Sequence, residues 1–456
     1  MIAIEFWLSI VRDSWCIVSP SCEIAKGLGL EDCMNWFANK VCDVFVSSHE
    51  TLELLLSFCQ ADRRPNDQIL RETDGLNMQI AGFFFTKGPK FWDGSMILPE
   101  KLRAFCHKLG VKTPQGDAID HVRQWCIVHS TQQSELETIC NLKKASHTLS
   151  ACAIRSALPY TWRTGGNYFV NKDKDSPYDA IRNAFYGGRA QIFKPGWQGD
   201  AVEFDINSAY GAALCGEIPD WQTYQNRSHG PYEPYWLDCT VELSGKVGPI
   251  PVRDKESGKL EYPTSGQWRG WWCGLDLERD GVRIVETYRE VYGRANNDLR
   301  APVEKWLELR SQTACKARKA TIRGLAVGLY GKLAQRPFSW GLWHASEGLP
   351  PLGSRQVGTT AWFAYPVKPK RLPLSLPTTA SYITASVRAT VWPYIGDGQA
   401  IYTHTDSVHM PLDYLQSGGV CPELGDRHGQ WSIKGEGHGD YRGVNDYSIG
   451  AKVVKL

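Results

Sequence analysis

The sequence predicts a multidomain α+β protein, and three observations support this fold class. A chain of 456 residues, 42% of them hydrophobic, is long enough for two to four domains with hydrophobic cores of their own. Residues 1–150 alternate short strand-like runs with helical runs, which is an α/β pattern. Residues 151–199 contain many prolines and glycines, which is typical of a boundary between domains.

Charge and cysteine content narrow the class of protein. The formal net charge is +2, so a surface for nucleic acid would have to be local, in clusters such as residues 316–323 and 368–371. The 14 cysteines form no Cys-x-x-Cys pair, which disfavours a zinc site and a secreted disulfide framework and favours buried thiols in a reducing cytoplasm. No run approaches eighteen apolar residues and no basic leader precedes the apolar start, so we expect neither a membrane span nor a signal peptide.

The chain is organised around a short apolar run that ends in polar residues. Residues 202–206 predict a strand with Glu203 and Asp205 on its solvent-facing side. Asn207 and Ser208 follow and predict the cap of a short helix. An aspartate at a strand end is also a common turn or cap residue, so Asp205 indicates a catalytic site only if it has partners.

A basic stretch downstream supplies the first partners. Four of its residues recur at spacings of three, four and seven and so share one face of a helix: Lys316, Lys319, Arg323 and Tyr330. Three cations and a ring are what a triphosphate and a stacked base require, although a solvated basic face is the plain alternative. Three glycines of the same helix each cost up to ~1 kcal/mol relative to alanine and indicate that something large approaches it closely. They are Gly324, Gly328 and Gly331.

A second carboxylate lies in residues 401–410, where β-forming residues flank a polar centre, as in a hairpin with Asp406 at its tip. Together with Asp205 it could hold two divalent cations, Mg²⁺ or Mn²⁺, roughly 3.5–4 Å apart. That arrangement activates a 3′-hydroxyl and stabilises a pyrophosphate leaving group. These residues therefore predict a phosphoryl-transfer site.

The three stretches resemble motifs A, B and C of family B DNA polymerases, in that order. The match is closest to the protein-primed branch of small phages and linear plasmids, because residues 185–189 also resemble the Tyr-x-Gly-Gly motif of that branch. The resemblance implies a right-hand polymerase palm and fingers with an N-terminal α/β, exonuclease-like (RNase H-like) domain. The implied segments are residues 1–150, the exonuclease-like domain; 151–216, the first part of the palm; 217–298, an insertion like the region that contacts the priming protein; 299–335, the fingers; 336–377, a second insertion-like loop; and 378–456, the second part of the palm.

The resemblance also implies roles for individual residues. Asp205 and Asp406 would be catalytic and would bind two metal ions together with the backbone carbonyl of Ile206. The nucleotide would be bound by Tyr210, Lys319, Arg323 and Tyr330. Primer-template DNA would be contacted by Tyr186, Gly187, Gly188, Arg189, Lys316, Thr405 and Tyr447.

The chain departs from the family pattern where a 3′→5′ exonuclease needs carboxylates for its metal ions. Glu5 begins the first exonuclease motif, but Trp7, Leu52 and His129 stand at the other expected positions. None of these three side chains binds a hard divalent cation as a carboxylate does. We therefore expect a degenerate exonuclease domain without proofreading.

Further departures concern the palm and its grip on DNA. His404 replaces the first aspartate of motif C and is expected to be non-catalytic, either as a residue of the hairpin tip or as a group that tunes metal binding. Asn445 stands where the family has a lysine that holds the primer strand, and only nine residues follow Tyr447. We therefore expect the thumb to be short or missing, with an oligomeric contact or an accessory subunit in its place.

The predicted function is that of a cytoplasmic, DNA-directed DNA polymerase that adds deoxynucleotides to a 3′-hydroxyl or to the hydroxyl of a priming protein, without proofreading. Its partners would be primer-template DNA, deoxynucleoside triphosphates and either a terminal priming protein or an accessory subunit. Two alternatives stay open. One is a non-catalytic nucleic-acid-binding or assembly protein with the polymerase fold, and the other is a polymerase that makes untemplated or short-primer products.

Overall fold

The computed structural model divides into two compact units, which we describe separately. Unit 1 comprises Met1–Ser156, Leu309–Gly328 and Arg336–Leu372, and unit 2 comprises Ala157–Glu308, Leu329–Gln335 and Pro373–Leu456. The structure describes residues 4–454 except 12–13, 19–23, 29, 38–41, 60–66, 73–77, 85–89, 114–117, 159–181, 220–233, 255–258, 294, 335–338 and 368–375. The basic cluster at 368–371 and part of the predicted boundary at 151–199 therefore lie outside the described residues.

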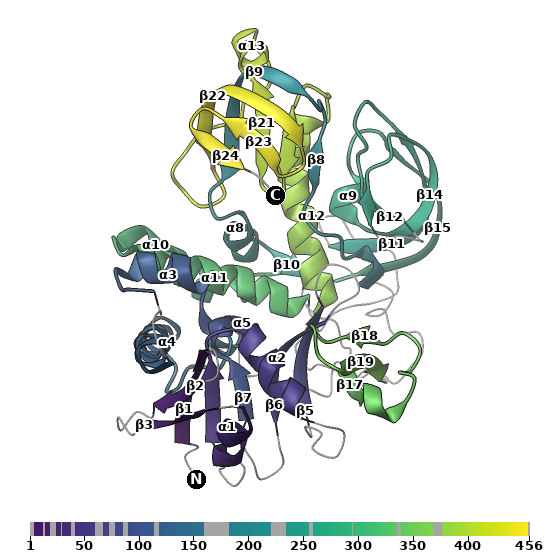
Figure 1. Ribbon diagram of the computed structural model, residues 1–456. Helices are drawn as coiled ribbons and strands as arrows, with labels where there is room; N and C mark the ends of the chain where they lie inside the picture. The colour runs from purple at the N-terminus through teal and green to yellow at the C-terminus, as the bar shows by residue number, and fades with distance from the viewer. Residues whose placement is uncertain are drawn as a thin grey trace. The chain divides into compact units, whose positions relative to one another are not determined.

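Unit 1 is built on a seven-stranded sheet with the order β3-β2-β1-β4-β7-β6-β5 (Figure 1). Its strands are β1 Ile4–Val11, β2 Ser14–Val18, β3 Ile24–Leu28, β4 Cys42–Val46, β5 Asp67–Glu72, β6 Met78–Phe84 and β7 Lys90–Asp93. The central strands β1, β4 and β7 run parallel, and the flanking pairs are antiparallel. Every residue of β4 is buried, as expected for a parallel strand that is covered on both faces.

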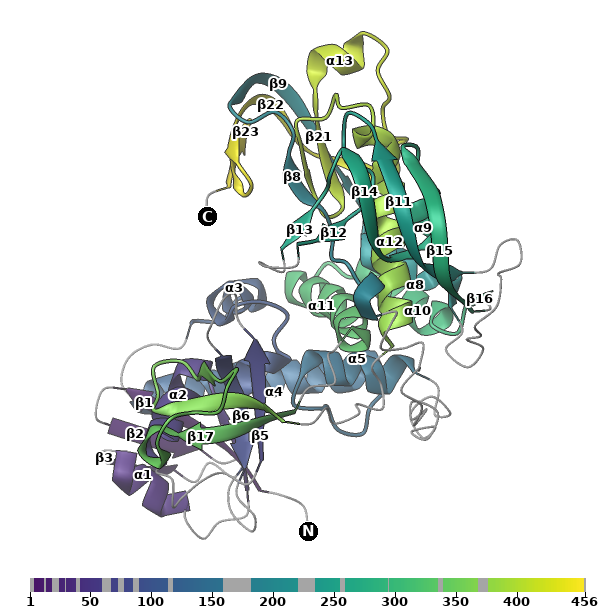
Figure 2. The ribbon, with the colours of Figure 1, turned by 90° about the vertical axis from the view of Figure 1, so that its right-hand side faces the viewer.

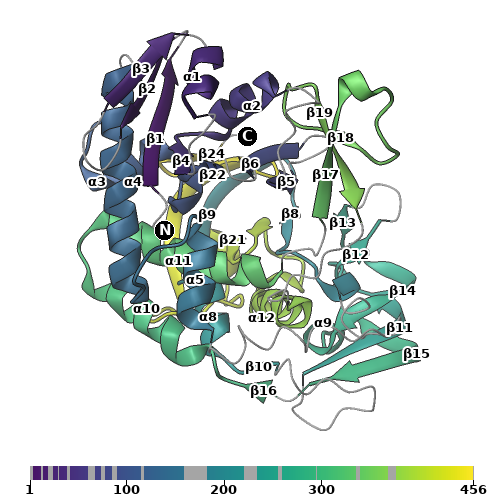
Figure 3. The same cartoon turned by 90° about the horizontal axis from the view of Figure 1, so that it is seen from below.

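Two helices lie between these strands and three follow the last strand, so the N-terminal part of the chain has the predicted mixture of strands and helices. The helices are α1 Leu30–Phe37, α2 His49–Phe58, α3 Leu102–Leu109, α4 Ala118–Cys140 and α5 Leu149–Ala157, with a short 3₁₀ turn η2 at Gly94–Ile97. Figure 3 shows α4 running alongside β1 and β2.

A small antiparallel sheet from the later part of the chain packs within unit 1. Its strands are β17 Ser339–His344, β18 Arg355–Gln356 and β19 Trp362–Val367, in the order β17-β19-β18, with a 3₁₀ turn η4 at Ala345–Glu347. The indole Nε1 of buried Trp362 donates to the carbonyl oxygens of Leu56, at 3.1 Å, and Cys59, at 3.0 Å. The indole thereby ties β19 to the C-terminal end of α2, where the Leu56 carbonyl also accepts from the Cys59 N–H.

Unit 2 contains a second seven-stranded sheet, antiparallel throughout, with the order β24-β23-β22-β9-β21-β20-β8. Its strands are β8 Ala190–Ile192, β9 Trp197–Ile206, β20 Tyr402–His404, β21 Ser407–Pro411, β22 Trp431–Gly443, β23 Asp446–Ile449 and β24 Lys452–Val454. Three helices accompany it: α8 Ala209–Cys215, α12 Pro377–Ile395 and α13 Leu412–Gln416. The strand predicted at residues 202–206 is the end of β9, which is the central strand of this sheet.

A hydrophobic core packs against one face of this sheet and contributes to the stability of β9. Phe204 of β9 and Val408 of β21 belong to one buried cluster with Val391 of α12. Each of these side chains is at most 2% exposed. Burying side chains of this size contributes roughly 1.5–3 kcal/mol each, so the strands on either side of β9 are fixed by packing as well as by backbone hydrogen bonds.

A smaller antiparallel sheet in unit 2 has the order β14-β11-β15 and lies beside α9 and α12 (Figure 2). Its elements are β11 Tyr235–Ser244, β14 Ser265–Cys273, α9 Gly274–Leu277 and β15 Val282–Tyr292. Short elements around it are η3 Arg182–Ala184, β10 Ile218–Pro219, β12 Val252–Arg253, β13 Leu260–Glu261 and β16 Ala295–Asn296. Trp236 and Trp272 are buried, and their indoles donate to Ser381 and to the Pro251 carbonyl.

Two helices occupy the segment expected to form the fingers, and the second is the helix predicted from the basic stretch. They are α10 Arg300–Gln312 and α11 Lys316–Leu333. Alanine Cβ atoms in place of Gly324 and Gly328 would lie 2.5 Å from Leu149 and 3.1 Å from Ser150, respectively. The close approach predicted from these glycines is therefore made by the protein's own α5 region, whereas a Cβ at Gly331 would meet no atom within 4 Å.

Two sequence expectations about the environment can be compared with the described residues. Among their helices, none is long and apolar enough to cross a membrane. The described cysteines are free thiols and most are buried, in agreement with the expected buried thiols.

Candidate active site

Asp205 lies on β9, and Asp406 lies in the turn that leads into the neighbouring strand β21. In the register of β9 with β21, Ser407 pairs with Asp205. The backbone N–H of Ile206 donates to the carbonyl oxygen of Asp406 at 2.9 Å, so the residue after one aspartate is bonded to the other aspartate. Both aspartate side chains are half-buried. The structure thus brings Asp205 and Asp406 together although about 200 residues separate them in sequence.

The hairpin that carries Asp406 is tightly built. Thr405 has a φ of +60°, in the left-handed region that non-glycine residues seldom adopt. Its N–H donates to the carbonyl of Arg189 at 2.6 Å, and the hydroxyl of Ser407 donates to the carbonyl of His404 at 3.1 Å. His404 itself is exposed at the end of β20. The turn therefore has backbone and side-chain partners that fix where Asp406 stands.

The turn after Asp205 forms differently from the predicted helix cap. Ser208 has a φ of +55° and its side chain makes no capping hydrogen bond to α8. The Asn207 amide instead donates to the Gly425 carbonyl at 2.9 Å, and its oxygen accepts from the Ser432 hydroxyl at 2.8 Å. Ser208 is the N-cap residue of α8, as predicted, but without a side-chain hydrogen bond to the helix, and Asn207 ties the turn to β22 and to the segment before it.

Glu203 was expected on the solvent-facing side of the strand, and this expectation is wrong. Its side chain is buried, and both carboxylate oxygens accept from Lys452 Nζ, at 2.5 and 2.6 Å. His409 Nε2 lies 4.0 Å from Glu203 Oε1, and His409 Nδ1 lies 2.8 Å from the Tyr441 hydroxyl oxygen. Burial, with further contributions from Lys452 and His404, lowers the pKa of His409 to about 3. The strands β22 to β24 cover the face that the sequence pattern left open.

The donor atoms at this site suit a hard divalent cation. Carboxylate and carbonyl oxygens are the ligands that Mg²⁺ prefers. The carboxylates of Asp205 on β9 and Asp406 in the adjacent turn, with a backbone carbonyl nearby, provide them. Within the described part of the chain, no three His, Cys, Asp or Glu side chains group closely enough to hold a metal ion. A metal shell on Asp205 and Asp406 would therefore need further oxygens, and the Ile206 carbonyl stays a prediction for one of them.

The two predicted pocket tyrosines are in contact. The rings of Tyr210 on α8 and Tyr330 on α11 stack with centroids 4.6 Å apart and planes 14° from parallel. Burial raises the pKa of the Tyr210 hydroxyl above its ordinary value, and the nearby Tyr330 and Asp406 raise it further. Tyr210 is therefore a neutral ring next to the motif C carboxylate.

The predicted triphosphate ligands lie on the part of α11 that belongs to unit 1. Lys316, Lys319 and Arg323 are all exposed, as a face that meets a ligand or solvent requires. The intervening Arg318 is used structurally, because its Nη2 donates to Glu135 of α4 at 3.0 Å. The structure confirms the helix and its basic face, and the binding of a triphosphate stays a prediction.

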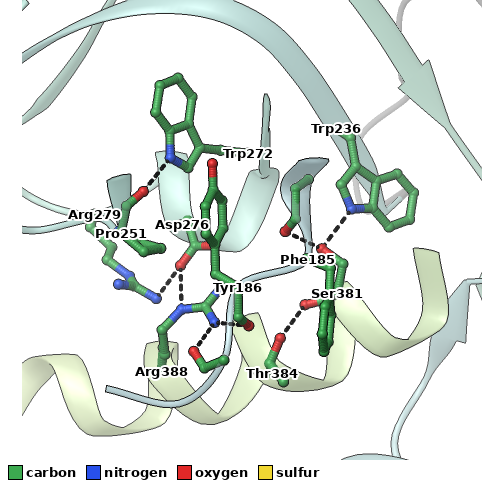
Figure 4. A network of polar contacts seen from close by, with 12 residues as sticks. Phe185, Tyr186, Trp236, Pro251, Trp272, Asp276, Arg279, Ser381, Thr384 and Arg388 are labelled. Atoms are coloured by element: carbon green, nitrogen blue, oxygen red, sulfur yellow. Dashed lines mark hydrogen bonds and ion pairs between the residues drawn. The ribbon is translucent and has the colours of Figure 1, made fainter. Parts of the chain in front are cut away.

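The segment resembling the Tyr-x-Gly-Gly motif is attached to the protein interior (Figure 4). Arg388 Nη1 donates to the carbonyls of Tyr186 and Gly187, both at 2.8 Å. A Cβ at Gly188 would lie 2.7 Å from the Thr405 side chain, so this glycine allows the segment to touch the motif C turn. A Cβ at Gly187 would meet no atom within 4 Å.

The side chains of Tyr186 and Arg189 point to internal partners instead of outward. Tyr186 is buried and its hydroxyl donates to the Trp271 carbonyl at 3.1 Å. Arg189 is buried and its Nη1 donates to the Gly248 carbonyl at 2.9 Å. Contact of these two side chains with DNA would require them to leave these partners. In the pattern Tyr-x-Gly-Gly the tyrosine stands two residues before the first glycine, and here that residue is the half-buried Phe185. The sequence-based prediction assigned the role to Tyr186 and missed Phe185.

Tyr447 is also part of a core. It is 6% exposed, its ring stacks on Tyr441 at 5.4 Å with planes 5° apart, and it lies 5.2 Å from the ring of Tyr402. The hydroxyl of Tyr402 in turn donates to the Asn445 side chain. The DNA contact of Tyr447 stays a prediction, and in the structure its ring packs against the seven-stranded sheet of unit 2.

The positions where exonuclease carboxylates were sought are buried in unit 1. Trp7, Leu52 and His129 are at most 3% exposed. The His129 ring lies 4.6 Å from the ring of Phe45 and 6.0 Å from that of Trp7. Burial, with a further contribution from His147, lowers the pKa of His129 to about 3, so the imidazole is neutral. Trp7 and His129 thus pack in an aromatic group with Phe45, and Leu52 belongs to the hydrophobic core of unit 1.

The fold can now be compared with known proteins. No family model and no curated protein matches the chain. Phi29 DNA polymerase in complex with primer-template DNA and incoming nucleotide superposes with a TM-score of 0.73 and 16% sequence identity, covering 100% of this chain and 90% of that chain. The complex of phi29 DNA polymerase with single-stranded DNA gives a TM-score of 0.71 and 15% identity, covering 100% and 89%.

These comparisons show the fold of the chain. The chain has the mixed α+β multidomain fold of a DNA polymerase. Among such folds it has that of phi29 DNA polymerase, a protein-primed family B enzyme, over its whole length. The fold implied by the sequence motifs is therefore confirmed.

Proposed function

We propose that this protein is a DNA-directed DNA polymerase that transfers deoxynucleotides by two-metal catalysis at Asp205 and Asp406. The observation that carries the proposal is the pairing of β9 with β21, in which Ile206 N–H donates to the Asp406 carbonyl at 2.9 Å. Two carboxylates held close together, one on a strand and one in the adjacent turn, suit two-metal phosphoryl transfer. The likeness of the fold to phi29 DNA polymerase supports the same reaction class.

Each side chain would have a defined task in this reaction. Mg²⁺ or Mn²⁺ bound by the two aspartates and the Ile206 carbonyl would activate the attacking hydroxyl and neutralise charge on the departing phosphates. The ring of Tyr210, next to Asp406, would exclude a 2′-hydroxyl from the sugar position. Lys319 and Arg323 keep their predicted role as ligands of the triphosphate, since both side chains are exposed and cationic.

The test is primer extension with purified protein, a labelled primer-template and Mg²⁺ or Mn²⁺. Asp205→Asn and Asp406→Asn should each lower incorporation by at least ~100-fold, because metal electrostatics supply most of the rate. Binding of the primer-template should change little in either variant. Asp413→Asn is a matched control, because Asp413 is an exposed aspartate on α13 of the same unit. Full incorporation by either active-site variant would rule out the assignment.

Two changes to the assay would distinguish the kinds of polymerase activity that remain open: omitting the template, and replacing the DNA primer with a protein hydroxyl. Templated extension of DNA without loss of the 3′ end fits a polymerase that lacks proofreading. Extension that starts from a serine, threonine or tyrosine hydroxyl would identify a priming protein as a partner. Extension without template would favour a polymerase that makes untemplated products.

A second candidate is a non-catalytic nucleic-acid-binding protein with the polymerase fold. The burial of Tyr186, Arg189 and Tyr447 bears on this choice, since an enzyme needs contacts that place the primer 3′-hydroxyl accurately, whereas general nucleic-acid binding does not. Tight binding of primer-template with no incorporation in Mg²⁺ or Mn²⁺ would support this candidate over the enzyme.

A further inference from the structure

Three buried arginines of unit 2 line one cavity, and two of them, Arg279 and Arg388, share one carboxylate. Arg189, Arg279 and Arg388 are 3%, 7% and 3% exposed, and Asp276 is completely buried. Arg388 donates to both oxygens of Asp276, at 3.0 and 2.6 Å, and Arg279 forms an ion pair with the same carboxylate at 2.6 Å (Figure 4). Guanidinium groups keep their proton near neutral pH, so this cluster carries two more positive than negative charges.

This excess charge is unusual inside a protein. Buried charges are normally paired, because removing an ion from water is costly unless an opposite charge replaces the water. Asp276 is the one carboxylate that the described residues bring to these arginines. Burial lowers the pKa of Arg189 to about 9, with a smaller lowering by Arg279, which is the expected response of a cation that lacks an opposite charge.

Two polar atoms in the cluster have no partner among the described residues. Arg279 donates through Nη1 to the Pro249 carbonyl at 2.6 Å, but its Nε has no hydrogen-bond partner. The buried hydroxyl oxygen of Tyr262 also lacks one. The guanidinium of Arg189 lies over the Tyr262 ring, with its Cζ 4.1 Å from the ring centroid. Buried donors that are unmatched in this way usually have a partner that is not part of the chain.

A small cavity is present at this cluster. It is lined by Arg189, Arg279, Arg388, Val391, Ile395 and Thr405. Its free space, about 10 Å³ for the centre of a water-sized sphere, suffices for one water molecule or one monatomic ion. A phosphate or a carboxylate group of a ligand is too large for it.

We infer that this cavity is a binding site for a monatomic anion, with chloride as the physiological occupant. The anion accepts from Arg279 Nε and balances part of the charge of the three guanidiniums. Because Arg388 also holds the carbonyls of Tyr186 and Gly187, and Thr405 lines the cavity, the bound anion stabilises the junction between this segment and the motif C turn. The inference concerns binding and stability and does not depend on nucleotidyl transfer.

The first measurement uses bromide as an anomalous scatterer. Crystals of the full chain grown in bromide should show an anomalous peak within hydrogen-bonding distance of Arg279 Nε. A site that is empty in such a map, or that holds a water molecule without anomalous signal, would overturn the inference.

The second measurement uses thermal unfolding at constant ionic strength. When gluconate is replaced by chloride, the Tm of the protein should rise saturably by about 2–4 °C, because an anion that binds only the folded state stabilises it. Arg279→Met should abolish the chloride-dependent rise. Arg283→Met is the matched control, since Arg283 is an exposed arginine of β15, and it should keep the rise in full. An equal rise in both variants, or none in the unmodified protein, would contradict the inference; if Arg279→Met does not fold, the bromide map decides.

Discussion

Replacing Gly188 with alanine tests whether contact between the Tyr-x-Gly-Gly-like segment and motif C controls the active site. The added Cβ would lie 2.7 Å from Thr405 Cγ2 and 3.1 Å from its Cα, whereas carbon atoms prefer about 3.5–4.0 Å. Thr405 or the segment would have to move by roughly 1 Å. Overpacking of this kind costs about 1–3 kcal/mol of folding free energy. A shift of about 1 Å at catalytic groups can cost up to ~100-fold in rate.

The assay is single-nucleotide incorporation at saturating nucleotide, with stability measured in parallel by urea unfolding. Gly187→Ala is the matched control, because its Cβ meets no atom within 4 Å and its φ is not in the left-handed region. We expect Gly188→Ala to lose about 10- to 100-fold in rate while Gly187→Ala stays within about twofold. Adding Thr405→Gly to Gly188→Ala should recover part of the stability, since glycine suits the positive φ of residue 405. If Gly188→Ala and Gly187→Ala behave alike, the contact does not position Asp406.

Three further outcomes are expected. Tyr210→Val should let the enzyme incorporate ribonucleotides at a rate closer to that of deoxynucleotides, and an unchanged preference in paired incorporation assays would exclude a role of the ring in sugar selection. The purified protein should not shorten a labelled single-stranded 3′ end in Mg²⁺ or Mn²⁺, and shortening that Glu5→Ala removes would reveal an exonuclease. Burial lowers the pKa of His129 and of His409 to about 3 in the folded protein. As the pH falls below about 6.5, these histidines therefore bind protons in the unfolded chain but not in the folded protein. Each histidine then lowers the free energy of unfolding, by about 2 kcal/mol at pH 5. His409→Gln should therefore lose less Tm between pH 7.5 and 5.0 than the unmodified protein, and an equal loss in calorimetry would refute this account.

The parts of the site that were predicted correctly are those with a local signal. Residues 202–206 and 401–410 each combine a β-forming run with one carboxylate, and both form strands of the same sheet. The basic face of α11 follows from a helical period within fifteen residues. Such patterns depend on neighbours in the sequence, so a single chain is enough to read them.

The residues that were misjudged have partners far away in the sequence. Glu203 is buried because Lys452, 249 residues later, reaches its carboxylate. The Tyr186 hydroxyl is occupied by the carbonyl of Trp271, 85 residues later. Nothing near Glu203 or Tyr186 in the chain predicts these contacts, because they follow from the order of strands in the sheets. Alternation of polar and apolar residues also cannot tell an open strand face from one that later strands cover.

The position of β9 between β21 and β22 also has a consequence for how the protein folds during synthesis. Both neighbours of β9 follow it by about 200 residues or more, since Ser407 and Ser432 pair with Asp205. At a synthesis rate of about 5–20 residues per second, β9 emerges about 10–40 s before either partner strand exists. During that interval the apolar residues of β9 have no sheet to join, and non-local pairing of this kind is slow even once the chain is complete. The strand that carries Asp205 is thus open to wrong pairing during this interval, and it is then available to chaperones that bind extended apolar segments.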